Sequence, residues 1–393
     1  MRKIIIFIYT FLNADFDVMT KETYLILNGK SLDGSVYEKI SKTSLDIMGY
    51  YDFYDFKLSS NIEFYHFDKE VKSYKNISEK YDNINNTTLK TLMISYNTPL
   101  YSLFYGVIPF RGGKFATIKD DESHGNGIEL LTDQVFVGYF ASIDCWAKFI
   151  LGRAAWQDNI NYNSLPPKNN GGVGDYILVT KQLGNNYIEF NYFKVYITLD
   201  LPSKETFRFG VLDLIGFGYI YDDSFDSNLV YWFEGGYSRI NENIRQMAIN
   251  SNPGGIGGLS TLSSLGYKVD DADTQGFAFK TGVKYSDEIS SYDYDIGFEY
   301  FKTYDGWVSM NQGILFNSNY SYWQNRGADQ ISIFGNIYIN NHVTVGINAS
   351  HSKSSYVSNP FSAAATTNPD TYDWSRKDFT VNERLVFSLK YKF

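Results

Sequence analysis

Residue types that could do chemistry are present, but none has the spacing that a known chemistry requires. The glycine-rich segment GGIGGLST at 254–261 lacks the GK[ST] ending of a phosphate-binding loop. The aspartates within 222–226 and 270–273 do not follow the DxDxDG pattern of a calcium loop. We therefore expect a flexible loop at the first segment and surface acids at the other two.

Nucleophiles and metal-ligand residues are equally sparse. Four histidines lie far apart in the sequence: His66, His124, His342 and His351. His342 is near Ser350, but a single strand would hold the two apart, and no G-x-S-x-G motif occurs. One cysteine excludes an intramolecular disulfide and a cysteine-based zinc site. The sequence thus predicts no enzyme, no catalytic residue, no metal and no cofactor.

The composition narrows the class of protein further. The 393 residues carry a net charge of −9, which argues against a nucleic-acid partner. Aromatic residues make up 18% and prolines number only 8, a balance that favours β-strands. Mean hydropathy is −0.29, and after the N-terminus no run of 18 apolar residues occurs, so a helical membrane protein is excluded. A membrane β-barrel remains, because its strands alternate apolar and polar residues.

Period-two alternation runs through most of the chain. It is clearest at the end, where Leu385, Phe387, Leu389, Tyr391 and Phe393 share one face. The same pattern recurs in further segments: 207–219, 277–285, 292–300, 331–339 and 343–349. Strands of about 10–14 residues exceed the ~5–6 of soluble sheets and suit a tilted membrane strand. The pattern favours an all-β, antiparallel transmembrane barrel over a soluble sandwich, which stays open as an alternative.

Short and long connections alternate along the chain, as in an outer-membrane barrel. Short turns are expected at 184–186, 200–204, 287–290 and 340–341. Long polar stretches fall at 68–87, 111–127, 153–174, 240–273, 306–328 and 353–381. From residue 88 this gives thirteen strands, and segments at 43–54, 56–67 and near 23–27 raise the number to about 16, with 14 or 18 as alternatives.

Three local features complete these expectations. Asn340-Asn341 is expected to form a two-residue type I′ turn, because asparagine tolerates the left-handed conformation. The connection 222–227 is expected to be short and external. A short helix is the alternative to a strand near Gly34 to Lys42.

The N-terminus has the layout of a secretory signal peptide. Arg2 and Lys3 precede an apolar stretch at 4–12 that is too short to span a bilayer, and Ala14 offers a cleavage site. A buried N-terminal strand is the alternative. We expect residues 1–14 to be the signal peptide and residues 15–393 to form a single barrel domain with long external loops.

The terminal segment LVFSLKYKF resembles the C-terminal signature of Gram-negative outer-membrane β-barrels. The matching residues are Phe387, Leu389, Tyr391 and Phe393, which the resemblance implies are read by the barrel-assembly machinery. The layout of the whole chain is similar to porins and to uncharacterised porin-like families. The resemblance implies a location in the outer membrane of a Gram-negative bacterium, surrounded by lipid. It also implies passive diffusion of small hydrophilic solutes or ions, and a homo-trimer.

Charges opposite the apolar faces are the candidate pore-lining residues, since Lys or Arg facing lipid at mid-bilayer costs ~2–4 kcal/mol. They are Arg208, Lys280, Lys284, Asp293, Asp295, Glu299, Arg384 and Lys390. Trp146 shares a face with Asp144 and Lys148 and is expected in the lumen too. These charges would set ion preference, or else form ion pairs that hold the wall. The alternative function is a barrel plugged by its loops, acting as adhesin, receptor or structural anchor.

Overall fold

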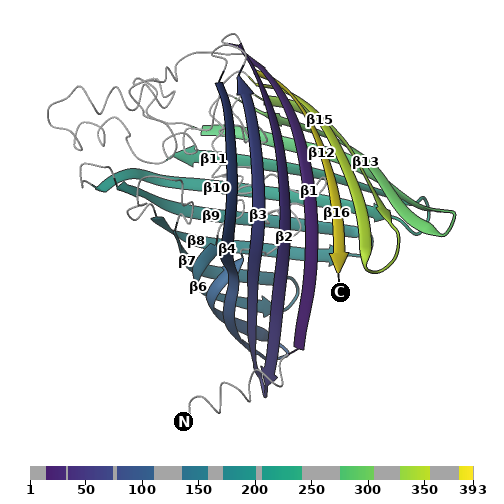
Figure 1. Ribbon diagram of the computed structural model, residues 1–393. Helices are drawn as coiled ribbons and strands as arrows, with labels where there is room; N and C mark the ends of the chain where they lie inside the picture. The colour runs from purple at the N-terminus through teal and green to yellow at the C-terminus, as the bar shows by residue number, and fades with distance from the viewer. Residues whose placement is uncertain are drawn as a thin grey trace, which may run out of the picture.

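The computed structural model is a closed barrel of sixteen antiparallel β-strands (Figure 1). It describes these residues: 15–31, 34–73, 78–109, 135–157, 171–200, 206–240, 275–304, 328–354 and 380–392. No helix in these ranges is long and apolar enough to cross a membrane. The fold class and the strand number predicted from the alternation are confirmed.

Each strand pairs with its neighbours in sequence, and the barrel closes through the first and last strands. The first eight strands are β1 (Asp15–Ser31), β2 (Gly34–Phe53), β3 (Phe56–Ser73), β4 (Ser78–Asn97), β5 (Tyr101–Pro109), β6 (Val135–Asp144), β7 (Lys148–Gln157) and β8 (Gly171–Leu183). The other eight are β9 (Asn186–Asp200), β10 (Thr206–Asp223), β11 (Leu229–Ile240), β12 (Gln275–Ile289), β13 (Tyr292–Thr303), β14 (Ala328–Tyr338), β15 (Val343–Ser354) and β16 (Thr380–Lys392).

Tight turns gather at one end of the barrel, which we call the tight-turn end. The turn between β12 and β13 places Ser290 and Ser291 at φ 51° and 70°, the left-handed pair of a type I′ hairpin. The turn between β14 and β15 is built differently, and the type I′ expectation there is wrong, because neither asparagine has a positive φ. Instead Asn340 Oδ1 accepts the backbone N–H groups of His342 at 2.8 Å and Val343 at 2.9 Å.

The strands before residue 100 are longer than the sequence indicated. The segment near Gly34 to Lys42 is part of β2, so the helix alternative is wrong. The polar stretch 68–87 largely continues β3 and β4. Hydrogen bonding between neighbouring strands outweighs weak hydrophobic patterning here, since extended strands satisfy their backbone groups whatever their side chains.

Two turn positions also differ from the expectation. β10 ends at Asp223 and β11 begins at Leu229, both at the tight-turn end, so the connection expected at 222–227 lies with the tight turns and not at the end of the long connections. The ends of β9 and β10 at 200 and 206 lie at the opposite end instead. Trp146 is not in a strand facing the lumen, because it lies in the turn between β6 and β7 and is 69% exposed.

Candidate functional site

The barrel wall inverts the usual burial pattern of a soluble protein. On β13 the carboxylates of Asp295 and Glu299 are buried, whereas Ile296 and Phe298 are 51% and 42% exposed. Polar side chains therefore face inward and large apolar side chains face outward. This arrangement suits a wall with lipid outside and water or polar groups inside.

Aromatic rings line the tight-turn end of the outward face. Over β2 to β5 the rings of Tyr51, Phe53, Phe56, Tyr96 and Tyr101 follow one another with centroid separations of 5.0–6.2 Å. At the turn tips, Tyr54, Trp146 and Phe225 are at least 69% exposed. Such a belt is typical of the interface between lipid and water.

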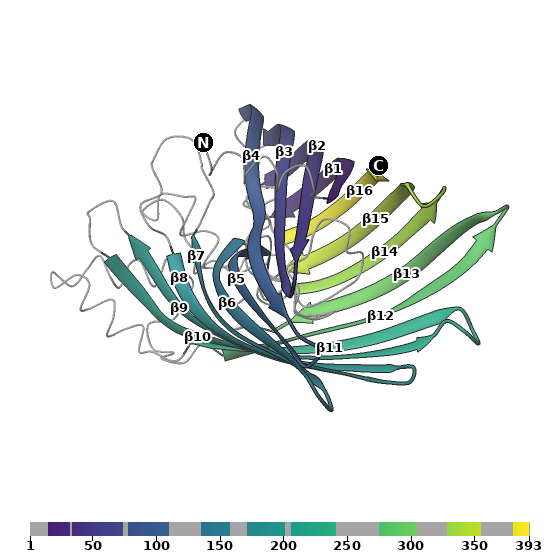
Figure 2. The same ribbon diagram turned by 90° about the horizontal axis from the view of Figure 1, so that it is seen from below.

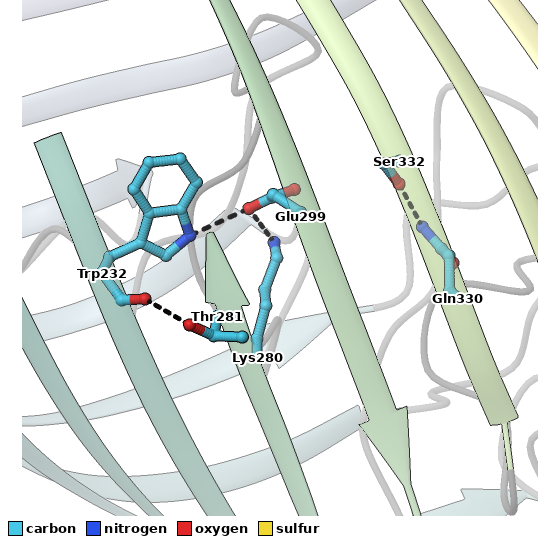
Figure 3. Close-up of polar contacts among 6 residues, drawn as sticks. All are labelled: Trp232, Lys280, Thr281, Glu299, Gln330 and Ser332. Atoms are coloured by element: carbon cyan, nitrogen blue, oxygen red, sulfur yellow. Dashed lines mark hydrogen bonds and ion pairs between the residues drawn. The ribbon is translucent and has the colours of Figure 1, made fainter. Parts of the chain in front are cut away.

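One polar group on the inward face is centred on Glu299 (Figure 3). Glu299 Oε1 lies 3.2 Å from Lys280 Nζ and accepts a hydrogen bond of 3.1 Å from Trp232 Nε1. The Thr281 hydroxyl donates to the Trp232 carbonyl at 3.0 Å and so joins β12 to β11. Glu234 lies opposite Lys280 in the strand register and is 1% exposed. One lysine thus lies between two buried carboxylates.

Glycine makes the place for the indole of this group. A Cβ at Gly282 would lie 2.2 Å from Trp232 Cζ2, so no larger residue fits beneath the ring. Trp232 also packs with Tyr187 and Phe334 into a buried cluster on the inward face. The ring of Phe334 lies over Gly297 in the same manner, with its Cζ 2.2 Å from the position of a Cβ. Bare glycine positions therefore let aromatic rings lie flat along the concave wall.

A further buried carboxylate, Glu189 on β9, lies two strands from Glu234 on β11. It accepts a hydrogen bond of 2.9 Å from the Tyr187 hydroxyl and one of 3.5 Å from Asn191 Nδ2. Gly218 on β10 pairs with Glu189 on one side and with Glu234 on the other. The register therefore places one carboxylate on each side of Gly218, a position that has no side chain to separate them.

Asp295 forms a third polar group near the tight-turn end. Its Oδ1 accepts hydrogen bonds from the backbone N–H and the side-chain amide of Asn336, at 3.1 and 2.9 Å. Its Oδ2 accepts one of 2.8 Å from the Tyr338 hydroxyl. All three donors are uncharged, so this carboxylate is held on the inward face by neutral groups.

Charges of both signs lie on the other side of the barrel, where Lys21, Lys42, Asp46 and Glu63 are buried. β1 is eight strands from β9 in either direction around the closed order, so the two strands face each other. Lys21 pairs in register with Lys390, and Lys42 Nζ lies 2.9 Å from Glu63 Oε1 and 4.9 Å from the centroid of the Tyr65 ring. Both walls thus contain an ion pair between neighbouring strands.

The residues predicted to line the pore fall into three sets. Lys280, Asp295 and Glu299 are buried on the inward face, where two of them form an ion pair. Four others share that face by strand alternation: Lys284, Asp293, Arg384 and Lys390. The side chain of Arg208 lies outside those described, and the register shift between Arg208 and Gly210 interrupts the alternation from which its position was predicted.

Sequence reasoning missed several inward residues, including Trp232, Glu189 and Glu234. Tyr231, Trp232 and Phe233 form a continuous aromatic run, so alternation of hydropathy gives no sign that the middle ring faces inward. The signal that could have found Trp232 was its position two residues before Glu234, because residues two apart on a strand share a face. No cluster of metal-ligating side chains occurs among the described residues.

No protein-family model matches this chain, and no curated protein matches it in sequence. Similarity is found to solved structures of outer-membrane proteins. OprB of Pseudomonas putida matches with 9% identity and a TM-score of 0.52, over 97% of this chain and 94% of that one. The outer membrane channel DcaP of Acinetobacter baumannii matches with 12% identity and a TM-score of 0.51, over 97% and 98%.

A third structure, the outer membrane protein OmpT of Vibrio cholerae, matches with 9% identity and a TM-score of 0.51, over 97% of both chains. At these identities the matches establish the fold. The chain has the closed antiparallel barrel fold of outer-membrane porins and channels, which confirms the fold that the terminal segment implied.

Proposed function

We propose that this protein is a channel of the Gram-negative outer membrane, through which small hydrophilic solutes or ions diffuse passively. The observation that carries the proposal is the inverted wall, with buried charges inside and exposed apolar side chains outside a closed barrel. A sixteen-strand barrel is wide enough to hold an aqueous path. The shared fold of known channels supports the same function.

In this proposal the inward charges filter what passes. Glu189, Glu234 and Glu299 lie on the alternate strands β9, β11 and β13 and bring negative charge to one side of the lumen. Lys280 offsets part of that charge through its contact with Glu299. We expect the remaining excess of negative charge on this wall to set the preference for cations or anions, because charged walls determine ion preference in wide pores.

Single-channel conductance of the refolded protein in a planar lipid bilayer, under a salt gradient, tests the proposal. Discrete and reproducible steps are expected, and the sign of the reversal potential reports which wall dominates. A barrel that is folded, as judged by heat-modifiable migration on a gel, yet never conducts would contradict the channel function.

One observation favours the plugged barrel as a second candidate. Leu178, Leu214 and Glu189 face inward and are fully buried, although they belong to a wall that a wide open channel would leave wet. In this alternative the lumen is closed and the protein is an adhesin, receptor or anchor. Deletion of 240–273, which lies almost wholly outside the described residues, should raise conductance if that segment narrows the lumen and leave it unchanged if it does not.

A signal peptide, a barrel-assembly signal, surrounding lipid and an oligomer belong to the same proposed function. Residues 1–14, outside the described ranges, would be removed as a signal peptide, leaving 15–393 as the barrel domain. The barrel-assembly machinery would read Phe387, Leu389 and Tyr391, which are 39–44% exposed on the outward face, together with Phe393, which is outside the described ranges. Lipid would surround the outward band, and further copies of the chain would associate; the resemblance implies three copies, a number that the two-fold contact inferred below replaces.

A further inference from the structure

Apart from those beside the tight turns, most outward-facing charges on the described strands lie at the ninth residue or later, counted from the tight-turn end. Counted from the tight-turn end, Lys302, Lys353 and Arg239 are each the eleventh residue of their strands. With a rise of about 3.3 Å per residue and a tilt of about 45°, this leaves an apolar band of roughly 25 Å, the height of a membrane band.

Glu22, the eighth residue of β1, departs from this pattern, and Arg153 departs further. It is only the sixth residue of β7 from the tight-turn end, which places its Cα about 12 Å above the turn and near the middle of the band. Its neighbours Gly152 and Ala154 belong to the inward set, so Arg153 is on the outward face. Its Nε lies 3.6 Å from Oδ1 of Asp175, the directly paired residue on β8.

This ion pair is accessible from outside the barrel. The two side chains are 51% and 42% exposed. Asp175 also lies opposite Lys194 in the register, and the row of paired residues continues through Asp213 to Arg239. Positive and negative charges therefore alternate across five strands. Along this row the residues lie progressively farther from the tight-turn end. An outward arginine at mid-bilayer is unfavourable in contact with acyl chains, and pairing with one carboxylate only partly offsets the desolvation of two ions.

A hollow in the outward face lies beside the pair. It has a volume of about 620 Å³ and is bordered by Arg153 and Asp175. Apolar and tyrosine side chains line most of it, among them Ile94, Leu103, Tyr105, Tyr139 and Leu151. The strands that form its floor, β5 to β7, curve strongly (Figure 2), and their described parts are 9 or 10 residues long. The wall is therefore indented where its charge is least suited to lipid.

We infer that a second copy of this chain covers this face, across a two-fold axis normal to the membrane. Such an axis exchanges left and right on the facing wall, so Arg153 of one copy meets Asp175 of the other, and the reciprocal pair forms at the same contact. The Arg153–Asp175 pair of one copy is thereby complementary in charge to the same pair of the other copy. An anionic lipid headgroup fits less well, because it would meet Asp175 beside the arginine.

This contact makes two copies, not three, the unit in the membrane. It rests on the membrane location within the proposed function but not on conduction. The tyrosines around the hollow suit such an interface, since aromatic residues and arginine are enriched at protein contacts. The four charges at the axis would then lie away from both water and lipid, each next to charges of opposite sign.

Charge reversal with differently tagged copies tests the inference in native-lipid nanodiscs. Arg153→Glu alone and Asp175→Lys alone should each weaken self-association roughly thirtyfold or more, because like charges meet at the axis. When the two variants are mixed, the new glutamate of one copy faces the new lysine of the other, and co-purification of the two tags should return. Lys302→Glu and Asp329→Lys make the same charge changes in an outward pair outside the hollow and should leave association unchanged.

Folding and conduction are measured beside association. Heat-modifiable migration shows whether each variant forms a barrel. Leu151→Trp fills the hollow without changing charge, so it replaces any charge variant that does not fold and should likewise weaken self-association. A monomeric wild type, or association that survives both single reversals, would overturn the two-fold contact. Conductance that persists in dissociated variants leaves the channel proposal intact, whereas a silent wild-type dimer would contradict the channel alone.

Discussion

Replacement of Gly282 by alanine should destabilise the barrel by displacing Trp232. The added methyl would lie 2.2 Å from Trp232 Cζ2 and 2.8 Å from the Phe298 carbonyl oxygen. An ordinary contact begins at 3.4 Å, so the indole must move by about 1.2 Å. Backbone lies beneath the new methyl, which leaves the ring as the part that gives way.

The magnitude follows from two effects. Overpacking of a well-filled site costs about 1–3 kcal/mol. Movement of the ring also stretches the 3.1 Å hydrogen bond from Trp232 Nε1 to Glu299, and a bond to a charged group contributes about 1.5–3 kcal/mol. We expect a total loss of about 3 kcal/mol, or roughly a hundredfold in the unfolding equilibrium.

Urea unfolding of the protein refolded in phospholipid vesicles measures this loss, with the folded band of unheated samples as the readout. Gly235→Ala is the matched control, because nothing lies within 4 Å of a Cβ at that outward position. In a Trp232→Phe background the cost of Gly282→Ala should fall, since the smaller ring leaves room for the methyl. Equal midpoints for Gly282→Ala and Gly235→Ala would refute the packing argument.

Three further predictions concern the two faces of the wall. Glu299→Gln should shift the reversal potential towards anions in a planar bilayer, because it removes an inward negative charge, whereas Asp329→Asn on the outward face should not. Ile296→Arg should cost about 2–4 kcal/mol in urea unfolding, against little for Glu288→Arg beside the turn, and equal costs would contradict the lipid-facing assignment. Phe387→Ala should reduce the yield of folded barrel in cell outer membranes more than Ile347→Ala does, although both remove outward apolar area and should lose similar stability in vitro, about 1–3 kcal/mol each; equal yields would indicate a packing role.

The fold could be predicted because apolar and polar residues alternate along most strands. A one-residue shift would turn every apolar side chain to the wrong face, so each clear strand specifies its own register. Precision is lost in β1 to β4, where polar residues such as those at 68–73 extend strands beyond the apolar band. Backbone pairing continues there without any demand on hydropathy.

The site was less predictable than the fold. Lys280, Asp295 and Glu299 stand out because a charge opposite an apolar face is conspicuous in sequence. Trp232 was missed because an aromatic residue that faces inward depends on a glycine in the next strand, and neighbouring strands are not known until the register is. The Arg153–Asp175 pair depends on register in the same way, since the residues are 22 positions apart.

Closure of the barrel through β1 and β16 has a consequence for the order of folding. The pairing runs from Met19 with Lys392 to Lys30 with Val381, so it joins segments separated by nearly the whole chain. Every other pair of strands can form as a local hairpin, but this seam can form only after the last strand has been synthesised. Until then β1 presents an unpaired edge, to which any extended segment could add. Pairing of β1 with β16 is therefore the step that removes the last open edge of the barrel.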